Sequence, residues 1–310
     1  MEVKAKEWPV NECMNRPFFL KSYVQLEMKQ LCNSLRGVKR VPYVELKDGN
    51  KLWYAGKGMP VVFLHGWMGS SFCYSNPIDY FSKAYRVFVF EHKGHGKSDR
   101  PEDASYALPE FAEELNQALD KLVGDEKFVL IGHSMGGMFS LVYATTSDFK
   151  KRLKGLILMS TTPKFENPGV QEYINLIKKG EMSLEPNPED ANNILVPLCF
   201  NQKYIQTHEE TIKKFVEEKL KNPEYVAFKT LIDFVDHYNV EDKLAEIEVP
   251  TLILAGDEGI MVSPENSRSM HRKIKNSELK IFSPKIGHYI QFEALDEYNK
   301  VVDSFLKRLE

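Results

Sequence analysis

The 310-residue sequence lacks any uninterrupted apolar run near the roughly 20 residues that a membrane-spanning helix needs, so we expect no stable membrane insertion. It also lacks a basic excess, since 41 lysines and arginines against 44 aspartates and glutamates give a net charge of −3. A field of that sign does not attract nucleic acid, and we predict no nucleic-acid partner. The first thirty residues contain no apolar core of the signal-peptide kind.

Cysteine is sparse, and no two cysteines form a C-x-x-C pair. The four lie far apart, at Cys13, Cys32, Cys73 and Cys199. This spacing favours reduced thiols in a cytoplasmic protein over a disulfide framework. Two cofactor patterns are also incomplete. His92 and His95 have no third ligand nearby in the sequence, and "GHGKS" would need glycine where Glu91 stands to match a phosphate-binding loop. We therefore predict no metal and no organic cofactor.

What the sequence does contain is a series of short apolar runs separated by helical patterns. With 43% hydrophobic and 27% charged residues, the composition suits one large globular domain, alone or with an insertion. The runs are residues 60–65, 86–91, 127–132, 154–160, 249–256 and 278–283. Nearly continuous apolar strands are typical of a parallel sheet covered on both faces. The alternation therefore predicts an α/β fold with a doubly wound, mostly parallel sheet.

Three parts of the chain are distinguished by their patterns. Residues 1–40 form an N-terminal extension, in which 18–35 has the spacing of an amphipathic helix. This helix either docks on the main domain, covers a site as a flap, or presents a face to a membrane. Residues 41–162 and 249–310 form the α/β core. Residues 163–248 show helical patterns without a clear strand, which predicts an inserted helical lid. Its aromatic residues are candidates for lining an acyl pocket or for packing the lid on the core: Phe165, Tyr173, Phe200, Tyr204, Phe228 and Phe234.

The strongest functional signal is "LIGHSMGG", residues 130–137. An apolar strand leads directly into Gly132-His133-Ser134-Met135-Gly136, and a helical pattern follows. This is G-x-S-x-G in the strand–turn–helix setting of a nucleophile elbow. Glycine is needed beside the nucleophile because a Cβ there would collide with the neighbouring strand and helix. We predict that Ser134 is a catalytic nucleophile.

Two further segments supply partners for that serine. "FLHGWMGSS" ends a strand two strands earlier, so the backbone N–H groups of Trp67 and Met135 are candidates for an oxyanion hole. "IGHYIQFE" follows the last strand and places His288 at its carboxyl end, where sites in open α/β sheets gather. The order Ser…His is the order that a nucleophile elbow predicts, so His288 is the candidate general base.

From about residue 41 to 310, the chain resembles the α/β-hydrolase family, in the serine-nucleophile branch with a helical cap. That branch contains esterases, lactonases, carbon–carbon bond hydrolases and cofactor-free haloperoxidases. The segment "EHKGHGKSDRP" is similar to the family's D-x-R-G-x-G-x-S loop, with Glu91 and Lys93 in place of Asp and Arg. "VPTLILAGDE" and "GHYIQFE" resemble its acid and histidine segments. The serine at the elbow separates this chain from relatives that carry Asp there.

The family's acid position is the fourth residue of G-x-x-D, and here that residue is Gly259. Three interpretations are open. Asp257 reaches His288 through a local change in the loop, which we take as the first candidate for the triad acid. Alternatively, Glu258 or a carboxylate from elsewhere serves. In the third interpretation the acid is absent, which leaves a slow Ser–His dyad or an inactive binding protein.

These patterns predict a serine hydrolase that cleaves a small or medium carboxylic ester, thioester or lactone through an acyl-enzyme. The alternatives are a carbon–carbon bond hydrolase of the same fold and a catalytically weakened, receptor-like member. The expected partner is a small-molecule ester or acyl substrate. The sequence leaves the oligomeric state open, a homodimer included.

Overall fold

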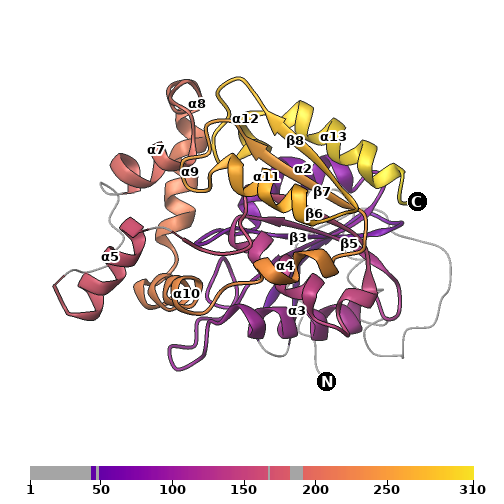
Figure 1. Ribbon diagram of the computed structural model, residues 1–310, viewed down its shortest axis with the longest axis horizontal. Helices are drawn as coiled ribbons and strands as arrows, with labels where there is room; N and C mark the ends of the chain where they lie inside the picture. The colour runs from indigo at the N-terminus through magenta and orange to yellow at the C-terminus, as the bar shows by residue number, and fades with distance from the viewer. Residues whose placement is uncertain (1–42, 47–48, 167, 182–190) are drawn as a thin grey trace.

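The computed structural model describes residues 43–46, 49–166, 168–181 and 191–310 (Figure 1). The N-terminal extension predicted for residues 1–40, with its helix over 18–35, lies outside the described residues.

The core is one eight-stranded sheet in the order β1-β2-β4-β3-β5-β6-β7-β8. Its strands are β1 (Tyr43–Glu45), β2 (Lys51–Ala55), β3 (Pro60–Leu64), β4 (Arg86–Glu91), β5 (Phe128–His133), β6 (Leu153–Met159), β7 (Thr251–Gly256) and β8 (Ser277–Phe282). β2 pairs antiparallel with β1 and β4, and every other neighbouring pair is parallel. The six predicted apolar runs are strands β3 to β8, and the expected α/β fold with a mostly parallel sheet is confirmed.

Side chains alternate between the two faces of the sheet and divide the apolar core in two. Val62 and Leu64 of β3 belong to one cluster, whereas Val61 and Phe63 belong to the other. The first cluster packs against α3 (Leu108–Leu122), α4 (Met135–Thr145) and α11 (Pro264–Lys273), and the second against α2 (Ser75–Phe81) and α13 (Leu295–Lys307). Helices therefore cover both faces (Figure 1), as the continuous apolar strands require.

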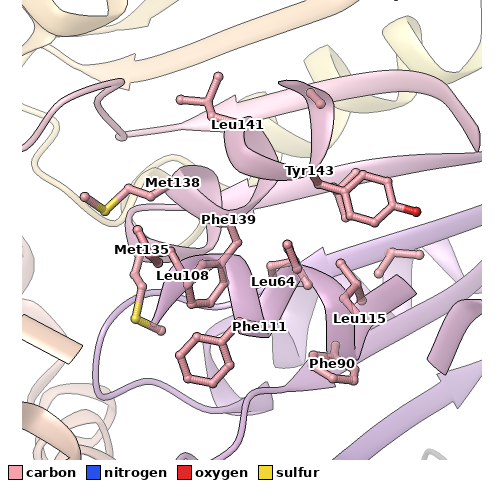
Figure 2. Packing of buried hydrophobic residues seen from close by; sticks show 14 of the residues in the cluster. Leu64, Phe90, Leu108, Phe111, Leu115, Met135, Met138, Phe139, Leu141 and Tyr143 are labelled. Atoms are coloured by element: carbon pink, nitrogen blue, oxygen red, sulfur yellow. The ribbon is translucent and has the colours of Figure 1, made fainter. Parts of the chain in front are cut away.

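The first cluster packs beneath the β5–α4 turn. Figure 2 shows Phe111 of α3 and Phe139 of α4 side by side over Leu64 and Phe90 of the sheet, and the ring centroids of Phe111 and Phe139 are 4.8 Å apart. Met135, the first residue of α4, is also buried in this cluster. Close packing on this side holds the start of α4 rigidly against the sheet.

Between β6 and β7, residues 163–248 leave the sheet and return to it, and we call this segment the helical insertion. Its described elements are α5 (Pro168–Lys178), the short π-helix η3 (Ala191–Leu195), α7 (Val196–Cys199), α8 (Gln202–Thr207), α9 (Glu209–Leu220), α10 (Glu224–Asp236) and the 3₁₀ turn η4 (Glu241–Glu246). A single bridge between Lys164 and Asn239, together with a 2.9 Å bond from the N–H of Val240 to the oxygen of Pro163, closes its base. Its helices lie at one end of the sheet, on the left of Figure 1.

The turn between β5 and α4 is built on glycines that approach other backbone very closely. A Cβ at Gly132 would lie 2.3 Å from the carbonyl oxygen of Gly136, and a Cβ at Gly136 would lie 2.2 Å from the oxygen of Leu64. Ser134 between them has φ 54° and ψ −118°, a conformation that L-residues rarely adopt. The collision expected from the sequence is confirmed, and the turn depends on both glycines.

Replacing Gly136 by Ala should therefore destabilise the protein more than the same change at Gly124. A Cβ at residue 124 would meet nothing within 4 Å, and only its φ of 57° opposes alanine. We expect a loss of at least about 3 kcal/mol at residue 136 and about 1–2 kcal/mol at residue 124. The measurement is the free energy of unfolding in urea. Equal losses would show that the β5–α4 turn tolerates a side chain.

Candidate active site

The candidate residues gather where the parallel strands end. Ser134 follows β5, His65 and Trp67 follow β3, Asp257 follows β7, and His288 lies in the loop after β8. Because these strands run in the same direction, their carboxyl ends share one edge of the sheet, which is where sites of open α/β folds form.

Ser134 is fixed by hydrogen bonds to its backbone. Its N–H donates to the oxygen of Met159 at 2.8 Å, and its own carbonyl accepts from the N–H groups of Gly137 and Met138 at 2.8 and 3.1 Å. The hydroxyl of Thr161 donates to the same carbonyl at 2.8 Å. The side chain remains half-exposed at the start of α4. The positive end of the helix dipole therefore faces the position where charge would develop on a substrate carbonyl.

Two unused N–H groups lie on either side of this serine. Within the described residues, neither Trp67 nor Met135 uses its backbone N–H in a hydrogen bond. A Cβ at Gly66, the residue before Trp67, would lie 3.1 Å from the Cβ of Ser134, so the β3 loop passes directly over the serine. This placement suits an oxyanion hole, which needs free donors beside the nucleophile.

His288 is buried next to the elbow, with 3% of its surface exposed. Its N–H donates to the oxygen of Cys199 at 2.9 Å. Its carbonyl accepts from Nε2 of His133 at 3.0 Å, and the two imidazole rings are 4.7 Å apart. No hydrogen bond joins the imidazole of His288 to Ser134 in the described structure. His133, the residue before Ser134, holds His288 beside the serine. Hydrogen bonds between a catalytic histidine and its serine often tighten only when substrate is bound.

The electrostatics of this pocket keep His288 neutral. Burial lowers its pKa well below the usual range, and the nearby His133 and Lys219 lower it further. Burial likewise lowers the pKa of His133 to about 3. A neutral imidazole can accept a proton from a hydroxyl, so His288 is in the protonation state that a general base requires.

The structure does not bring Asp257 to His288, in contrast to the first expectation for the triad acid. The carboxylate of Asp257 is exposed and accepts from the N–H groups of Lys285 and Ile286 at 3.2 and 2.8 Å. Nδ1 of His288 is buried and has no hydrogen-bond partner among the described residues. Asp257 immediately follows the last residue of β7, so its side chain meets the neighbouring loop at the strand exit. It holds the loop that carries His288 and does not touch the imidazole.

The other two positions on this loop do not supply the acid either. Glu258 is exposed, with its backbone N–H bonded to the oxygen of Ile286. A Cβ at Gly259 would lie 2.5 Å from the oxygen of Val262, so the loop in this form leaves no space there for a carboxylate. Of the three interpretations of the acid, the geometry favours a Ser–His pair without a carboxylate on the imidazole.

One half-buried acid near His288 was not identified from the sequence. Glu293 accepts from the N–H groups of Asn201 and Gly287 at 2.9 and 3.1 Å, which links the start of α8 to the residue before His288. Burial raises its pKa to about 7, and these N–H donors oppose the rise. Glu293 belongs to "GHYIQFE", and its position five residues after His288 in the same motif is the signal that could have indicated it.

The helical insertion holds the β3 loop in place through four groups. Nε1 of Trp67 donates to the oxygen of Ala227 and the hydroxyl of Thr230 at 3.1 and 3.0 Å. The amide of Asn222 donates to the oxygen of Met68 at 2.9 Å, and Nζ of Lys219 donates to the oxygen of Trp67. Sequence patterns could not indicate these bonds, because they join residues about 150 positions apart.

Of the aromatic residues expected in the insertion, Phe200 lies nearest the site. Its ring stacks on Tyr289, the residue after His288, with centroids 5.1 Å apart and planes at 20°. The rings of Phe165 and Phe234 are 6.1 Å apart. Phe234 belongs to the first core cluster, and Phe165 and Phe228 pack against it. Tyr204 stacks on Phe200 at 5.4 Å. The side chain of Tyr173 lies outside the described residues.

Comparison with known proteins agrees with this geometry. A family model described as the alpha/beta hydrolase fold matches residues 59–295. The chain belongs to the α/β-hydrolase family. A proline iminopeptidase of Saccharolobus solfataricus is 31% identical over 82% of this chain and 86% of its own length. A 2-hydroxy-6-oxo-6-phenylhexa-2,4-dienoate hydrolase of Comamonas testosteroni is 28% identical over 82% and 90%.

Solved structures place the same fold around these residues. A thermophilic esterase from Thermogutta terrifontis superposes with a TM-score of 0.75 at 23% identity, covering 84% of this chain and 94% of the esterase. The resemblance inferred from the motifs is therefore confirmed, and the chain is a hydrolase of the α/β fold. In the part of the chain that is described, no helix combines the length and apolarity needed to cross a membrane.

Burial holds the pKa of His288 below 6.5. The decline of kcat/KM on the acid side of the pH profile should therefore occur below pH 6.5. Activity is then constant from pH 6.5 to 8 and declines only as His288 takes up a proton at lower pH. The measurement is kcat/KM for a 4-nitrophenyl ester between pH 4.5 and 8, with protein stability followed at each pH. An inflection at or above pH 6.5 would contradict the neutral, buried imidazole.

Asp257→Asn should reduce kcat by less than about tenfold, compared with about 10⁴ for the loss of an acid that orients the imidazole. The reason is that the amide oxygen still accepts from Ile286, so only the longer bond from Lys285 is lost, while nothing is lost at Nδ1 of His288. Glu258→Gln, an exposed neighbour, is the matched control. A 100-fold or greater loss confined to Asp257→Asn would restore Asp257 as the triad acid.

Proposed function

We propose that this chain is a serine hydrolase that cleaves small or medium carboxylic esters, thioesters or lactones through an acyl-enzyme. The observation that carries the proposal is the serine at φ 54° between two close-packed glycines, with free N–H groups on both sides. A strained turn of this kind presents a nucleophile, and it persists only where the surrounding structure enforces it.

In the proposed reaction, Oγ of Ser134 attacks the carbonyl carbon while its proton passes to the imidazole of His288. The carbonyl oxygen becomes an oxyanion that accepts from the N–H groups of Trp67 and Met135. Collapse of the tetrahedral intermediate breaks the ester bond, and the leaving alcohol takes the proton back from His288. Water then attacks the acyl-serine by the same route and releases the acid.

Among the described residues no carboxylate bonds to the imidazole of His288, and this favours esters over amides. An amine leaves only after it is protonated, which requires a stabilised imidazolium, and a buried carboxylate normally supplies that stabilisation. The oxygen leaving group of an activated ester depends less on protonation by the imidazolium. The proline iminopeptidase and the dienoate hydrolase among the relatives still make amide and carbon–carbon bond cleavage the natural alternatives. Nδ1 of His288, which has no partner among the described residues, also supports a fourth candidate, a weakly active member of the family that binds ligands.

We further propose that the helical insertion acts as a lid over the acyl pocket. It contributes Phe200 beside Tyr289, and its helices hold the loop that carries Trp67. A segment with both contacts can shape the pocket and position the oxyanion donors.

Ser134→Ala should abolish ester hydrolysis and labelling by a fluorophosphonate probe, because only an activated serine is phosphonylated. The fold should be unaffected, since Oγ makes no hydrogen bond in the described structure. A panel of 4-nitrophenyl esters of graded length, with proline 4-nitroanilide and a dienoate as additional substrates, separates the four candidates. Ser140→Ala is the matched control, since this buried serine bonds only within α4.

Wild-type turnover in Ser134→Ala would refute the assignment of Ser134 as the nucleophile. Absence of labelling and of turnover in the wild type would instead favour the binding protein.

A further inference from the structure

Lys219 is a buried cation that the proposed reaction does not use. In α9, the buried residues are Ile212, Phe215, Val216 and Lys219, which is the spacing of one apolar helix face. Lysine thus stands where the pattern calls for an apolar side chain, and only 4% of its surface is exposed. Lysine is almost never buried to this extent unless a negative group accompanies it.

No such group accompanies it in the described part of the chain. Among the described residues, no carboxylate forms an ion pair with Lys219, and its only hydrogen bond runs from Nζ to the oxygen of Trp67. Nζ lies 5.2 Å from the ring of Phe215 and 5.8 Å from that of Tyr289. An ammonium group has three donors, so two remain for another partner.

This ammonium lies beside the reacting groups. Trp67, whose oxygen it binds, follows the glycine that packs against Ser134. Its charge lowers the pKa of His288 and of His133, which places it within electrostatic reach of both. Burial lowers the pKa of Lys219 itself, opposed only by the thiols of Cys73 and Cys199. An anion bound here would compensate a charge that the protein leaves unpaired.

A purely structural role does not require the charge. Asn222, three residues later, performs the equivalent task with a neutral amide, which donates to the oxygen of Met68 at 2.9 Å. Burying an ammonium instead costs free energy that a carbonyl acceptor does not recover in full. The difference between these two neighbouring residues points to a ligand for Lys219.

We propose that Nζ of Lys219 binds a carboxylate of the substrate, so that this site selects esters, thioesters or lactones that also carry a free carboxylate. This inference rests on the proposed serine hydrolase function. The carboxylate oxygens take the two free N–H donors of the ammonium, and Phe215 and Tyr289 exclude water from the pair. In such a site a charge-assisted bond is stronger than one in water.

The test compares pairs of esters that differ in one carboxylate. The first pair is 4-nitrophenyl hexanoate and the 4-nitrophenyl monoester of adipic acid, with the charge on the acyl side. The second pair is phenyl hexanoate and 4-(hexanoyloxy)benzoate, with the charge on the alcohol side. The readout is the ratio of kcat/KM for the anionic ester to that for the neutral ester, because a general loss of activity does not move this ratio.

The wild type should prefer the anionic ester in at least one pair. Lys219→Met, which keeps the length of the side chain and removes the charge, should lower that ratio about 10- to 100-fold, mainly through KM. Lys213→Met, an exposed lysine on the same helix, should leave it unchanged. A wild type that prefers the neutral ester in both pairs, or an unchanged ratio in Lys219→Met, would overturn the proposal.

Binding measurements keep the result decisive if Lys219→Met does not fold or if neither ester is hydrolysed. By calorimetry on the wild type and on Ser134→Ala, adipate should bind more tightly than hexanoate. The two acids share one carboxylate and differ in the second, so product-like binding at the oxyanion hole cancels. Equal or weaker binding of adipate would overturn the role of Lys219. Absence of Ser134-dependent hydrolysis with tighter adipate binding would refute only the proposed catalytic function.

Discussion

The site depends on the close approach of three stretches of backbone around Ser134. Gly132 lies against Gly136, and Gly136 lies against the carbonyl of Leu64 at distances that no side chain fits. Because β3, β5 and α4 meet without intervening atoms, the serine cannot relax out of its strained conformation. The same approach brings the loop after β3 over the serine, so one packing constraint places both the nucleophile and a candidate oxyanion donor.

Burial governs the charges around this point. It lowers the pKa of His288 and raises that of Glu293 to about 7. The two shifts act oppositely on stability. Between the native pKa of His288 and about 6.5, the unfolded chain binds more protons, so this histidine makes the native state more stable as pH rises. Glu293 keeps its proton longer in the native state, so its contribution to stability falls as pH rises from about 4.5 to 7. His288 is thus neutral at pH 7, and Lys219 is a buried cation beside it among the described residues.

The fold was predictable because its signals are local. The apolar runs that became β3 to β8 match the observed strands to within two residues at each end, and the elbow was indicated by five consecutive residues. That Asp257 does not reach His288 was not predictable, because the direction of its carboxylate depends on how the loop leaves the strand. Asp257 lies two residues before the family's acid position, which is Gly259. At the end of β7 this offset turns its carboxylate toward the N–H groups of Lys285 and Ile286. The bonds from the insertion to Trp67 join distant segments, so no local pattern indicated them.

The four bonds between the helical insertion and the loop of Trp67 limit how this enzyme could be re-engineered or diversify. The indole of Trp67 needs the acceptors on Ala227 and Thr230, and the carbonyls of Trp67 and Met68 need donors from α9 and the turn after it. An insertion transplanted from another hydrolase would have to place matching donors and acceptors at the same positions around Trp67 and Met68. Otherwise it would leave buried polar atoms unsatisfied. Pocket shape and oxyanion geometry are therefore inherited together, and a chimaera that exchanges one without the other starts from a damaged site.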